Sequence, residues 1–176
     1  NLGILDFINE KKKNGQIRNI GFSYHGGLQE FKDLIDVYDW DFCMIQFNYL
    51  DENTQAGKSG LDYAASKGLP VMIMEPLRGG KLVNKLPKEA MKVWDNAPVK
   101  RSPAEWALRW VWNHPAVVTV LSGMNSMEMI EENIRIASEA KAEELTPADL
   151  ALYDQVRKII LGKETVPCTG CGYCMP

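Results

Sequence analysis

Three cysteines near the end of the chain carry the densest chemical signal in the sequence. Cys168, Cys171 and Cys174 stand at two consecutive C-x2-C steps within Pro167–Pro176. This spacing brings three thiolates around one tight loop, and such clustering is typical of metal or redox chemistry rather than of a secreted disulfide framework. The remaining cysteine, Cys43, lies alone in an apolar stretch, where we expect a small buried side chain.

The spacing of the cysteine run distinguishes between metals. Structural zinc sites usually pair two separated C-x2-C knuckles, whereas a continuous C-x2-C-x2-C run favours an iron–sulfur cluster. Free or oxidised thiols are a further alternative. The run resembles the cysteine motif of ferredoxins, so we expect Cys168, Cys171 and Cys174 to be three ligands of a 4Fe–4S cluster. The fourth ligand is then expected beyond residue 176.

Two other segments suit a phosphate-bearing ligand. Gly79 and Gly80 follow an apolar run and stand between Arg78 and Lys81. Glycines let backbone N–H groups approach phosphate oxygens, and the basic side chains supply charge. Residues 123–126 lead into a predicted helix, whose N-terminus favours an anion.

Four apolar runs are predicted to be the strands that position these segments. We place the strands at Ile17–Ser23, Phe42–Phe47, Val71–Glu75 and Val117–Leu121. Their apolar residues are largely continuous, which is typical of parallel strands covered by helices. Ligand loops in such folds follow the C-terminal ends of strands, and both phosphate-suited segments do so.

Helical patterns alternate with the strands and predict an α/β fold. We expect helices over residues 2–14, 28–38, 59–67, 103–114, 127–137 and 147–162. Ser102 to Glu105 reads as a capping box with proline at the first helical position. Trp106 and Trp110 are expected to pack their helix against the sheet.

Three further segments have expected roles in packing, ligand access or connection. Met127, Ile130, Ile134 and Ala137 are expected to lie on one face of the helix over 127–137. The segment Leu77–Arg101 is an insertion that suits a lid or cofactor loop. Residues 139–144 read as an exposed linker.

Composition narrows the classes of partner. The 176 residues are 45% hydrophobic and 24% charged, with a net charge of −3. This is enough for one ordinary domain with a real core, and no basic field points to nucleic acid. No apolar run approaches the roughly 20 residues that span a bilayer. We therefore expect a cytoplasmic protein that binds neither nucleic acid nor membrane.

Four motifs in order resemble the second half of the aldo-keto reductases. The motifs are Ile17 to Ser23, Gln46 to Tyr49, Glu75 to Leu82, and Leu121 to Ser126 continuing through Glu131 to Ile134. The resemblance implies that residues 1–162 form strands 5 to 8 of a (β/α)8 TIM barrel, with a C-terminal helix. Residues 163–176 would begin a ferredoxin-like iron–sulfur segment that is truncated, as found in one subgroup of the family.

The resemblance also implies a reaction. Family members transfer hydride between NAD(P)H and a carbonyl or alcohol carbon, so a small-molecule carbonyl or alcohol is the expected substrate. The accessory iron–sulfur cluster would exchange electrons with a redox partner. The family's catalytic Asp, Tyr, Lys and His lie on the first four strand ends, so no catalytic residue is assigned here and the chain alone is expected to be inactive. His25, just after the fifth strand, could replace a catalytic acid, but a pocket-lining or loop-packing role is expected for it. A structural role is expected for His114.

The resemblance assigns cofactor-binding roles residue by residue. Ser23 and Gln46 would bond the nicotinamide carboxamide. The helix start at residues 123–126 would hold the adenosine ribose and its 2′-phosphate, with Glu132 and Asn133 facing the adenine. Met129 stands where many members have arginine, so the choice between NADP and NAD stays open. The complete expected set is Ser23, Gln46, Pro76, Leu77, Arg78, Gly79, Gly80, Gly123, Met124, Asn125, Met129, Glu132 and Asn133.

Two further functions stay open at this level. The chain could be an electron-transfer module whose cysteine run is the working part, with the barrel as a docking scaffold. It could instead be a non-catalytic, nucleotide-binding regulatory subunit of the same fold. Catalytic residues upstream would favour the enzyme over the regulatory subunit, and uptake of zinc alone by the cysteine run would exclude electron transfer.

Overall fold

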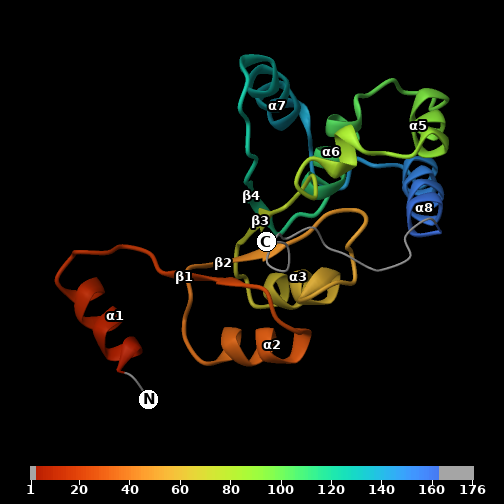
Figure 1. Cartoon of the computed structure of the whole chain (residues 1–176). Coiled ribbons are helices and arrows are strands. Elements are labelled where there is room, and N and C mark those ends of the chain that lie inside the picture. Colours follow the sequence, from red (N-terminus) through yellow and green to blue (C-terminus); the bar gives the residue numbers. More distant parts are fainter. Residues whose placement is uncertain (1–2, 163–176) are drawn as a thin grey trace, which may run out of the picture.

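Four parallel strands in chain order form the sheet at the centre of the fold (Figure 1). The computed structural model describes residues 3–162 and has β1 at Gly21–Tyr24, β2 at Phe42–Gln46, β3 at Val71–Met74 and β4 at Val117–Val120. Each strand pairs in parallel with the next. Their C-terminal ends therefore lie along one edge of the sheet, called here the carboxyl edge.

The first strand is shorter than its apolar pattern predicts. We expected it from Ile17, but the ladder begins at Gly21, whose partner is Phe42. Just before the ladder, the Ile20 N–H donates to Asp41 Oδ2 at 2.7 Å, and Lys12 Nζ donates to the same oxygen at 2.9 Å. The Asp41 N–H also donates to the Ile20 carbonyl at 2.9 Å, so Asp41 anchors the connection over residues 17–20 just before the ladder begins.

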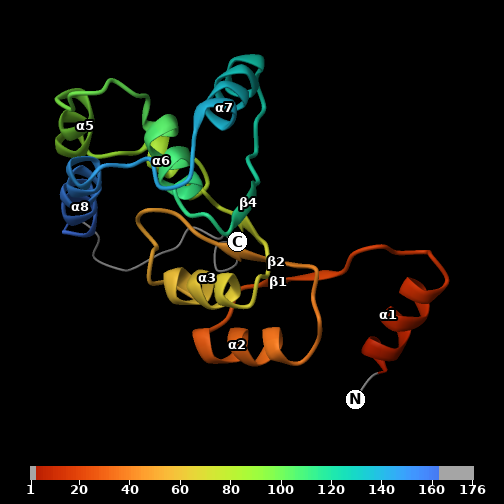
Figure 2. The ribbon, with the colours of Figure 1, turned by 180° about the vertical axis from the view of Figure 1, so that it is seen from behind.

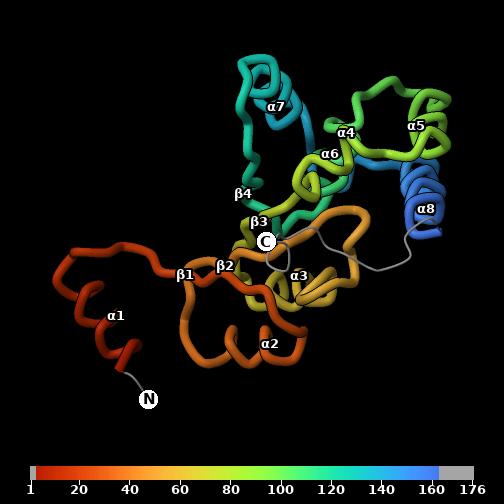
Figure 3. The backbone as a smooth tube through the Cα atoms, viewed as in Figure 1, coloured from red at the N-terminus to blue at the C-terminus, as the bar shows by residue number. Residues whose placement is uncertain are grey.

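Helices occur at every predicted place, and the insertion contributes two more. The elements outside the sheet are α1 (Ile4–Lys13), α2 (Leu28–Asp36), α3 (Gly57–Ser66), α4 (Lys81–Asn84), α5 (Lys88–Asp95), α6 (Pro103–Trp112), α7 (Met127–Glu139) and α8 (Pro147–Leu161). In Figures 1 and 2, α2 and α3 lie below the strands, and α5 to α8 lie above them. Figure 3 shows the segment between β4 and α7 as an extended arm.

The core is built between the strands and the helices packed on them. Cys43, Ile45, Val71 and Ile73 are buried strand residues, and Phe31 of α2 packs with them. The expectation for Cys43 is confirmed: its side chain is 0% exposed, and burial raises the pKa of the thiol to about 12. A thiol in this state is a small apolar side chain and not a nucleophile.

The insertion after β3 is a structural unit as well as a loop. Trp94 of α5 stacks on Trp106 of α6, with ring centroids 4.7 Å apart. Tyr153 of α8 contacts both rings, and its hydroxyl donates to the Trp106 carbonyl at 2.7 Å. These contacts hold α5, α6 and α8 together. Trp106 is thus a core residue, as predicted, but its aromatic partners lie on α5 and α8 rather than on the sheet.

One expectation about a helix start is wrong in detail. Ser102 Oγ accepts from the Glu105 N–H at 3.0 Å, but the Glu105 carboxylate does not complete the capping box. It binds Arg109 and Arg135 instead, because charge-assisted hydrogen bonds outcompete a neutral backbone donor. The complete capping box is at Thr146, which starts α8.

The apolar face of α7 is not the side that the rest of the chain covers. Met127 and Ile134 of the expected apolar face are 66% and 61% exposed, whereas Ile136 is fully buried. The side of α7 that carries Glu132 and Asn133 faces the rest of the described chain. The apolar periodicity correctly indicated a helix, but it did not determine which side the tertiary neighbours would cover.

Candidate functional site

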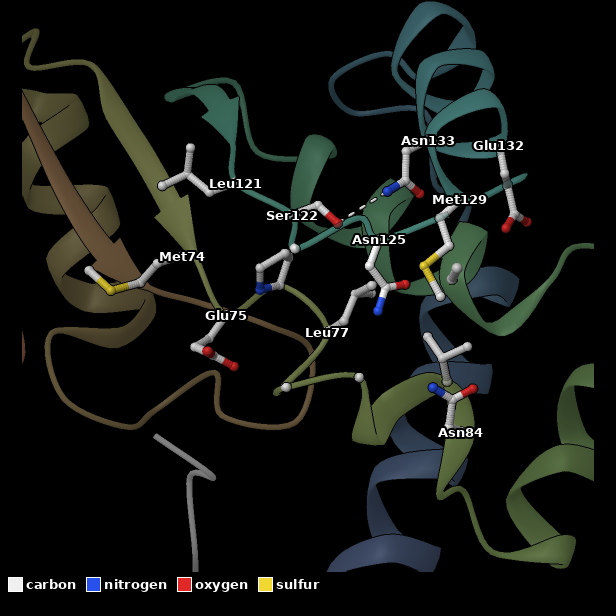
Figure 4. Close-up of a pocket in the computed structure, with 16 residues that line it drawn as sticks. Met74, Glu75, Leu77, Asn84, Leu121, Ser122, Asn125, Met129, Glu132 and Asn133 are labelled. Atoms are coloured by element: carbon white, nitrogen blue, oxygen red, sulfur yellow. Dashed lines mark hydrogen bonds between the residues drawn. The ribbon is translucent and has the colours of Figure 1, made fainter. Parts of the chain in front are cut away.

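A pocket of about 770 Å³ opens at the carboxyl edge, between the segments that follow β3 and β4. Ligand sites in parallel α/β folds lie at this edge. Figure 4 draws its lining residues: Met74, Glu75, Pro76, Leu77, Gly79, Gly80, Val83, Asn84, Ala104, Leu121, Ser122, Gly123, Asn125, Met129, Glu132 and Asn133.

The first wall is a turn of left-handed residues. Glu75, Arg78, Gly79 and Gly80 have φ angles of 55°, 51°, 60° and 77°. Glycine adopts this region freely, but each non-glycine residue there costs about 1–3 kcal/mol. The turn brings the backbone of Gly79 and Gly80 to the pocket surface, and no Cβ obstructs the approach of a ligand.

Buried polar side chains hold this strained turn in place. Asp51, from the loop after β2, lies 3.3 Å from the Arg78 Nε, and both residues are buried. Asn48 Nδ2 donates to Asp51 Oδ2 and to the Glu75 carbonyl, both at 3.1 Å. The loops after β2 and β3 are thereby tied together, which pre-shapes the wall before any ligand arrives.

Glu75 is a pocket residue that the predicted site set missed. Its Oε2 is buried and has no hydrogen-bond partner among the described residues. A buried carboxylate oxygen without a partner is costly, so a donor supplied by a ligand or by water would be favourable here. Its signal in the sequence is an acidic residue between an apolar strand and Pro76.

The second wall comes from the segment after β4 and from α7. Ser126 caps α7 by accepting from the Met129 N–H at 3.3 Å. Asn133 Nδ2 donates to Ser122 Oγ at 3.1 Å, the contact drawn as a dashed line in Figure 4. Ser102 Oγ donates to Glu132 Oε1 at 2.5 Å. These bonds fix the polar side chains that α7 presents to the pocket.

The pocket brings together nine of the thirteen residues predicted to bind cofactor. They are Pro76, Leu77, Gly79, Gly80, Gly123, Asn125, Met129, Glu132 and Asn133.

Four predicted residues lie outside the pocket. Arg78 is 4% exposed and engaged with Asp51, while Met124 is 40% exposed. Ser23 is exposed on β1. Gln46 ends β2 and is 2% exposed.

The polar ends of Gln46 are already engaged. Its Nε2 lies 3.4 Å from Asp51 Oδ2, and its Oε1 accepts from Gln55 at 3.3 Å. Of the residues expected at the two ends of the dinucleotide, Gly79 and Asn125 line the pocket, whereas Ser23 and Gln46 do not.

The two histidines are placed differently. His25 is exposed just after β1. His114 packs against the rings of Phe47 and Trp110, and its Nδ1 lies 3.0 Å from the Trp110 carbonyl oxygen. Burial lowers the pKa of His114, and the backbone hydrogen bonds only partly offset this. It lines a hollow of about 480 Å³ before β4, at the end of that strand opposite to the pocket.

The predicted cluster ligands Cys168, Cys171 and Cys174 lie outside the described residues. Among residues 3–162, no group of His, Cys, Asp and Glu side chains is arranged to hold a metal ion. Within the same range, no helix is both long enough and apolar enough to cross a bilayer.

The parallel sheet and the pocket at its carboxyl edge place the chain among the α/β proteins that bind a ligand at the C-terminal ends of their strands. The model of the aldo/keto reductase family matches residues 2–158. The chain belongs to the aldo/keto reductase family. No curated protein sequence matches it.

Solved structures of this family have the same fold over the matched part. The holo form of aldo-keto reductase AKR11C1 from Bacillus halodurans is 23% identical, with a TM-score of 0.68 over 84% of this chain and 53% of its own. An aldo-keto reductase from Klebsiella pneumoniae, solved in complex with NADPH, is 19% identical, with a TM-score of 0.66 over 87% of this chain and 52% of its own. The chain thus spans about half the length of the structures it matches.

Proposed function

We propose that this chain is the dinucleotide-binding part of an NAD(P)-dependent aldo-keto reductase. It would supply strands 5 to 8 of a (β/α)8 barrel and hold the cofactor for hydride transfer between nicotinamide and a carbonyl or alcohol carbon. The observation that carries the proposal is the pocket at the ends of β3 and β4, which combines a glycine turn with a helix start. The Klebsiella pneumoniae relatives, described as complexes with NADPH and with NADP and acetate, support it.

The pocket residues have separate tasks in this proposal. The Gly79 and Gly80 backbone would face the pyrophosphate, and the first turn of α7 would face the adenosine ribose and its 2′-phosphate, since free N–H groups and the helix dipole favour anions there. Glu75 Oε2 would accept from an N–H of the ligand. A firmly held dinucleotide fixes which nicotinamide face meets the substrate, and the nicotinamide supplies the hydride chemistry.

Ser23 and Gln46 keep their proposed role at the nicotinamide end. Both stand at or next to the carboxyl edge, although neither lines the pocket. Gln46 gives one amide hydrogen to Asp51 and has a second to offer. A contact to the carboxamide would therefore leave the network that positions Arg78 intact.

The binding proposal can be tested with one charge change. Asn125→Asp places a carboxylate at the pocket beside the expected phosphates, and we expect it to weaken dinucleotide binding at least about tenfold. Tryptophan fluorescence quenching by NADH and NADPH measures the Kd. Asn96→Asp, at the exposed end of α5, is the control and leaves the Kd unchanged. If neither dinucleotide binds the unmodified chain, the proposal is wrong.

Catalysis is proposed to need residues that this chain does not supply. The family's Asp, Tyr, Lys and His are expected on four other strand ends, so the 176-residue chain should bind cofactor without turnover. Carbonyl-dependent oxidation of NADPH, followed by absorbance, is the measurement. Turnover by the chain alone would show that the residues present are sufficient.

The cysteine run is proposed to hold an iron–sulfur cluster. Cys168, Cys171 and Cys174 have the spacing of cluster ligands, and softness favours thiolates for iron–sulfur sites. Anaerobic reconstitution with iron and sulfide, of a form that extends beyond residue 176, should give visible absorption that bleaches reversibly on reduction. Binding of zinc alone would reject the cluster.

A further inference from the structure

We infer that the Glu75 carboxylate makes the pocket bind the oxidised dinucleotide, whose nicotinamide ring is positively charged, more tightly than the reduced one. The inference rests on the proposed dinucleotide site and adds to it a preference for one oxidation state. It starts from the buried Glu75 Oε2, which has no hydrogen-bond partner among the described residues. In Figure 4, Glu75 lies on the β3 side of the pocket, opposite to Glu132 and Asn133 of α7.

The end of β2 fixes the place of Glu75 along the carboxyl edge. Gln46, the last residue of β2, pairs with Met74, so Glu75 is the first residue beyond that pair. Asn48 Nδ2 donates to the Glu75 carbonyl at 3.1 Å, which ties the end of β3 to the loop after β2. Glu75 therefore stands between Gln46, the proposed contact of the carboxamide, and the glycine turn at residues 79 and 80.

This order places Glu75 beside the nicotinamide half of the proposed ligand. With the pyrophosphate at the glycine turn and the carboxamide at Gln46, an extended dinucleotide must pass Glu75 between them. A φ angle of 55° holds Glu75 in the left-handed region, where a residue other than glycine is strained. Such strain clusters at ligand sites, where the surrounding contacts hold a side chain in position before a ligand arrives.

No basic side chain among the described lining residues neutralises the charge of Glu75. The nearest basic residue in sequence is Arg78, whose Nε lies 3.3 Å from Asp51 Oδ2. Both members of that pair are buried, so the charge of Arg78 is already balanced. Opposite charges attract more strongly where little water separates them. A positive ring next to Glu75 would therefore be stabilised.

The oxidation state of the nicotinamide decides whether this attraction exists. The oxidised ring carries a positive charge, whereas the reduced ring is neutral. The rest of the dinucleotide is the same in both forms, so its contacts with α7 and with the glycine turn cancel when the two forms are compared. Repulsion between Glu75 and the pyrophosphate cancels in the same way. The ratio of the two dissociation constants therefore isolates the effect of the carboxylate on the ring.

A preference for the oxidised form also changes the redox potential of the bound couple. Binding the oxidised form tenfold more tightly lowers the midpoint potential of a two-electron couple by about 30 mV. The bound reduced form is then the stronger hydride donor, which favours carbonyl reduction over alcohol oxidation on the protein. Glu75 would thus influence the direction of the proposed reaction through the cofactor.

Isothermal titration calorimetry of the chain with NAD⁺ and NADH, and with NADP⁺ and NADPH, tests the inference. Within each pair that binds, we expect the Kd of the oxidised form to be at least about fivefold lower. Glu75→Gln keeps the size of the side chain and removes its charge, so the ratio of the two Kd values should fall to about one. ADP-ribose, which lacks the nicotinamide, should still bind this variant, and its binding shows that the site is folded.

A matched control makes the same change of charge on the opposite wall. Glu132→Gln lies beside the expected adenine, so its effect falls on both forms alike and the ratio should equal that of the unmodified chain. The inference is overturned by a ratio near one in the unmodified chain, by a ratio that survives Glu75→Gln, or by a ratio that Glu132→Gln also abolishes. Each of these results leaves the dinucleotide site intact, whereas binding of no dinucleotide at all would reject the proposed function itself.

Discussion

His114 shows how burial controls the chemistry of a single residue. Its ring is enclosed by Phe47 and Trp110, and its Nδ1 is directed at the backbone of α6. Burial penalises the imidazolium, which lowers the pKa, so the folded chain holds the neutral form. In that form Nδ1–H donates to the Trp110 carbonyl. The residue is therefore a structural one, as its position before Pro115 predicts.

The lowered pKa of His114 predicts a pH dependence of stability. The unfolded chain takes up a proton near the ordinary value of 6.5, while the folded chain resists protonation to lower pH. The contribution of His114 to the free energy of unfolding should therefore be largest above about pH 7. It should fall as the pH drops below about 6.5. Urea unfolding across this range measures it.

The control for this prediction uses the other histidine. His114→Gln should remove the fall in the free energy of unfolding below about pH 6.5. His25→Gln, at an exposed position, should keep that fall. An unchanged slope in His114→Gln would assign the pH dependence to other groups.

At the scale of elements, one guanidinium joins α6, α7 and the segment leading to α8. Arg109 donates to Glu105 at 2.8 Å, to Glu139 at 2.9 Å and to Glu144 at 2.7 Å. Desolvation would raise the pKa of Glu105, but hydrogen bonds from Arg135 and Arg109 outweigh it and hold the pKa below its usual range. Residues 139–144, expected as an exposed linker, are in part a bracing segment.

Arg109 is predicted to be the critical member of this network. Arg109→Met removes the shared donor and leaves the buried Glu105 with one partner, so the free energy of unfolding should fall by about 3 kcal/mol. Urea unfolding monitored by circular dichroism provides the measurement. Arg135→Met, where the side chain is 46% exposed, should cause a much smaller loss. Equal losses in the two variants would contradict a special role for Arg109.

At the scale of the whole molecule, the described sheet is open at both sides. Among residues 3–162, β1 pairs only with β2, and β4 pairs only with β3. Large apolar side chains are exposed on β4 and just after it, with Val118 at 51% and Leu121 at 44%. Unpaired strand edges with apolar side chains favour association with another chain or segment. In a closed barrel, further strands would cover both edges.

The open sheet predicts that the chain self-associates in isolation. Val118→Lys places a charge on the outer strand β4 and should shift the population toward monomer, since charged edge strands oppose pairing. Sedimentation velocity measures the distribution. Val37→Lys, at a 58% exposed position after α2, is the control and should leave it unchanged. A monomer before any substitution would contradict the prediction.

Local patterns in the sequence were sufficient for the elements and for most pocket residues. Continuous apolar runs identified four parallel strands, and helical patterns identified the helices between them. Gly79 and Gly80 after a strand indicated a turn, and in the structure this turn is left-handed and lines the pocket. Such signals are readable because strand type, helix caps and left-handed turns depend on neighbouring residues.

What depended on contacts distant in sequence was decided by the tertiary structure alone. The face of α7 that turns inward, the partners of Glu105 and the enclosure of Gln46 each require knowledge of which segments meet. The Glu75 Oε2 atom, buried without a hydrogen-bond partner among the described residues, was also decided by tertiary structure. Whether a polar atom has a partner depends on every group around it. Periodicity along one chain segment specifies how side chains are distributed around that segment, but only packing determines what covers each side.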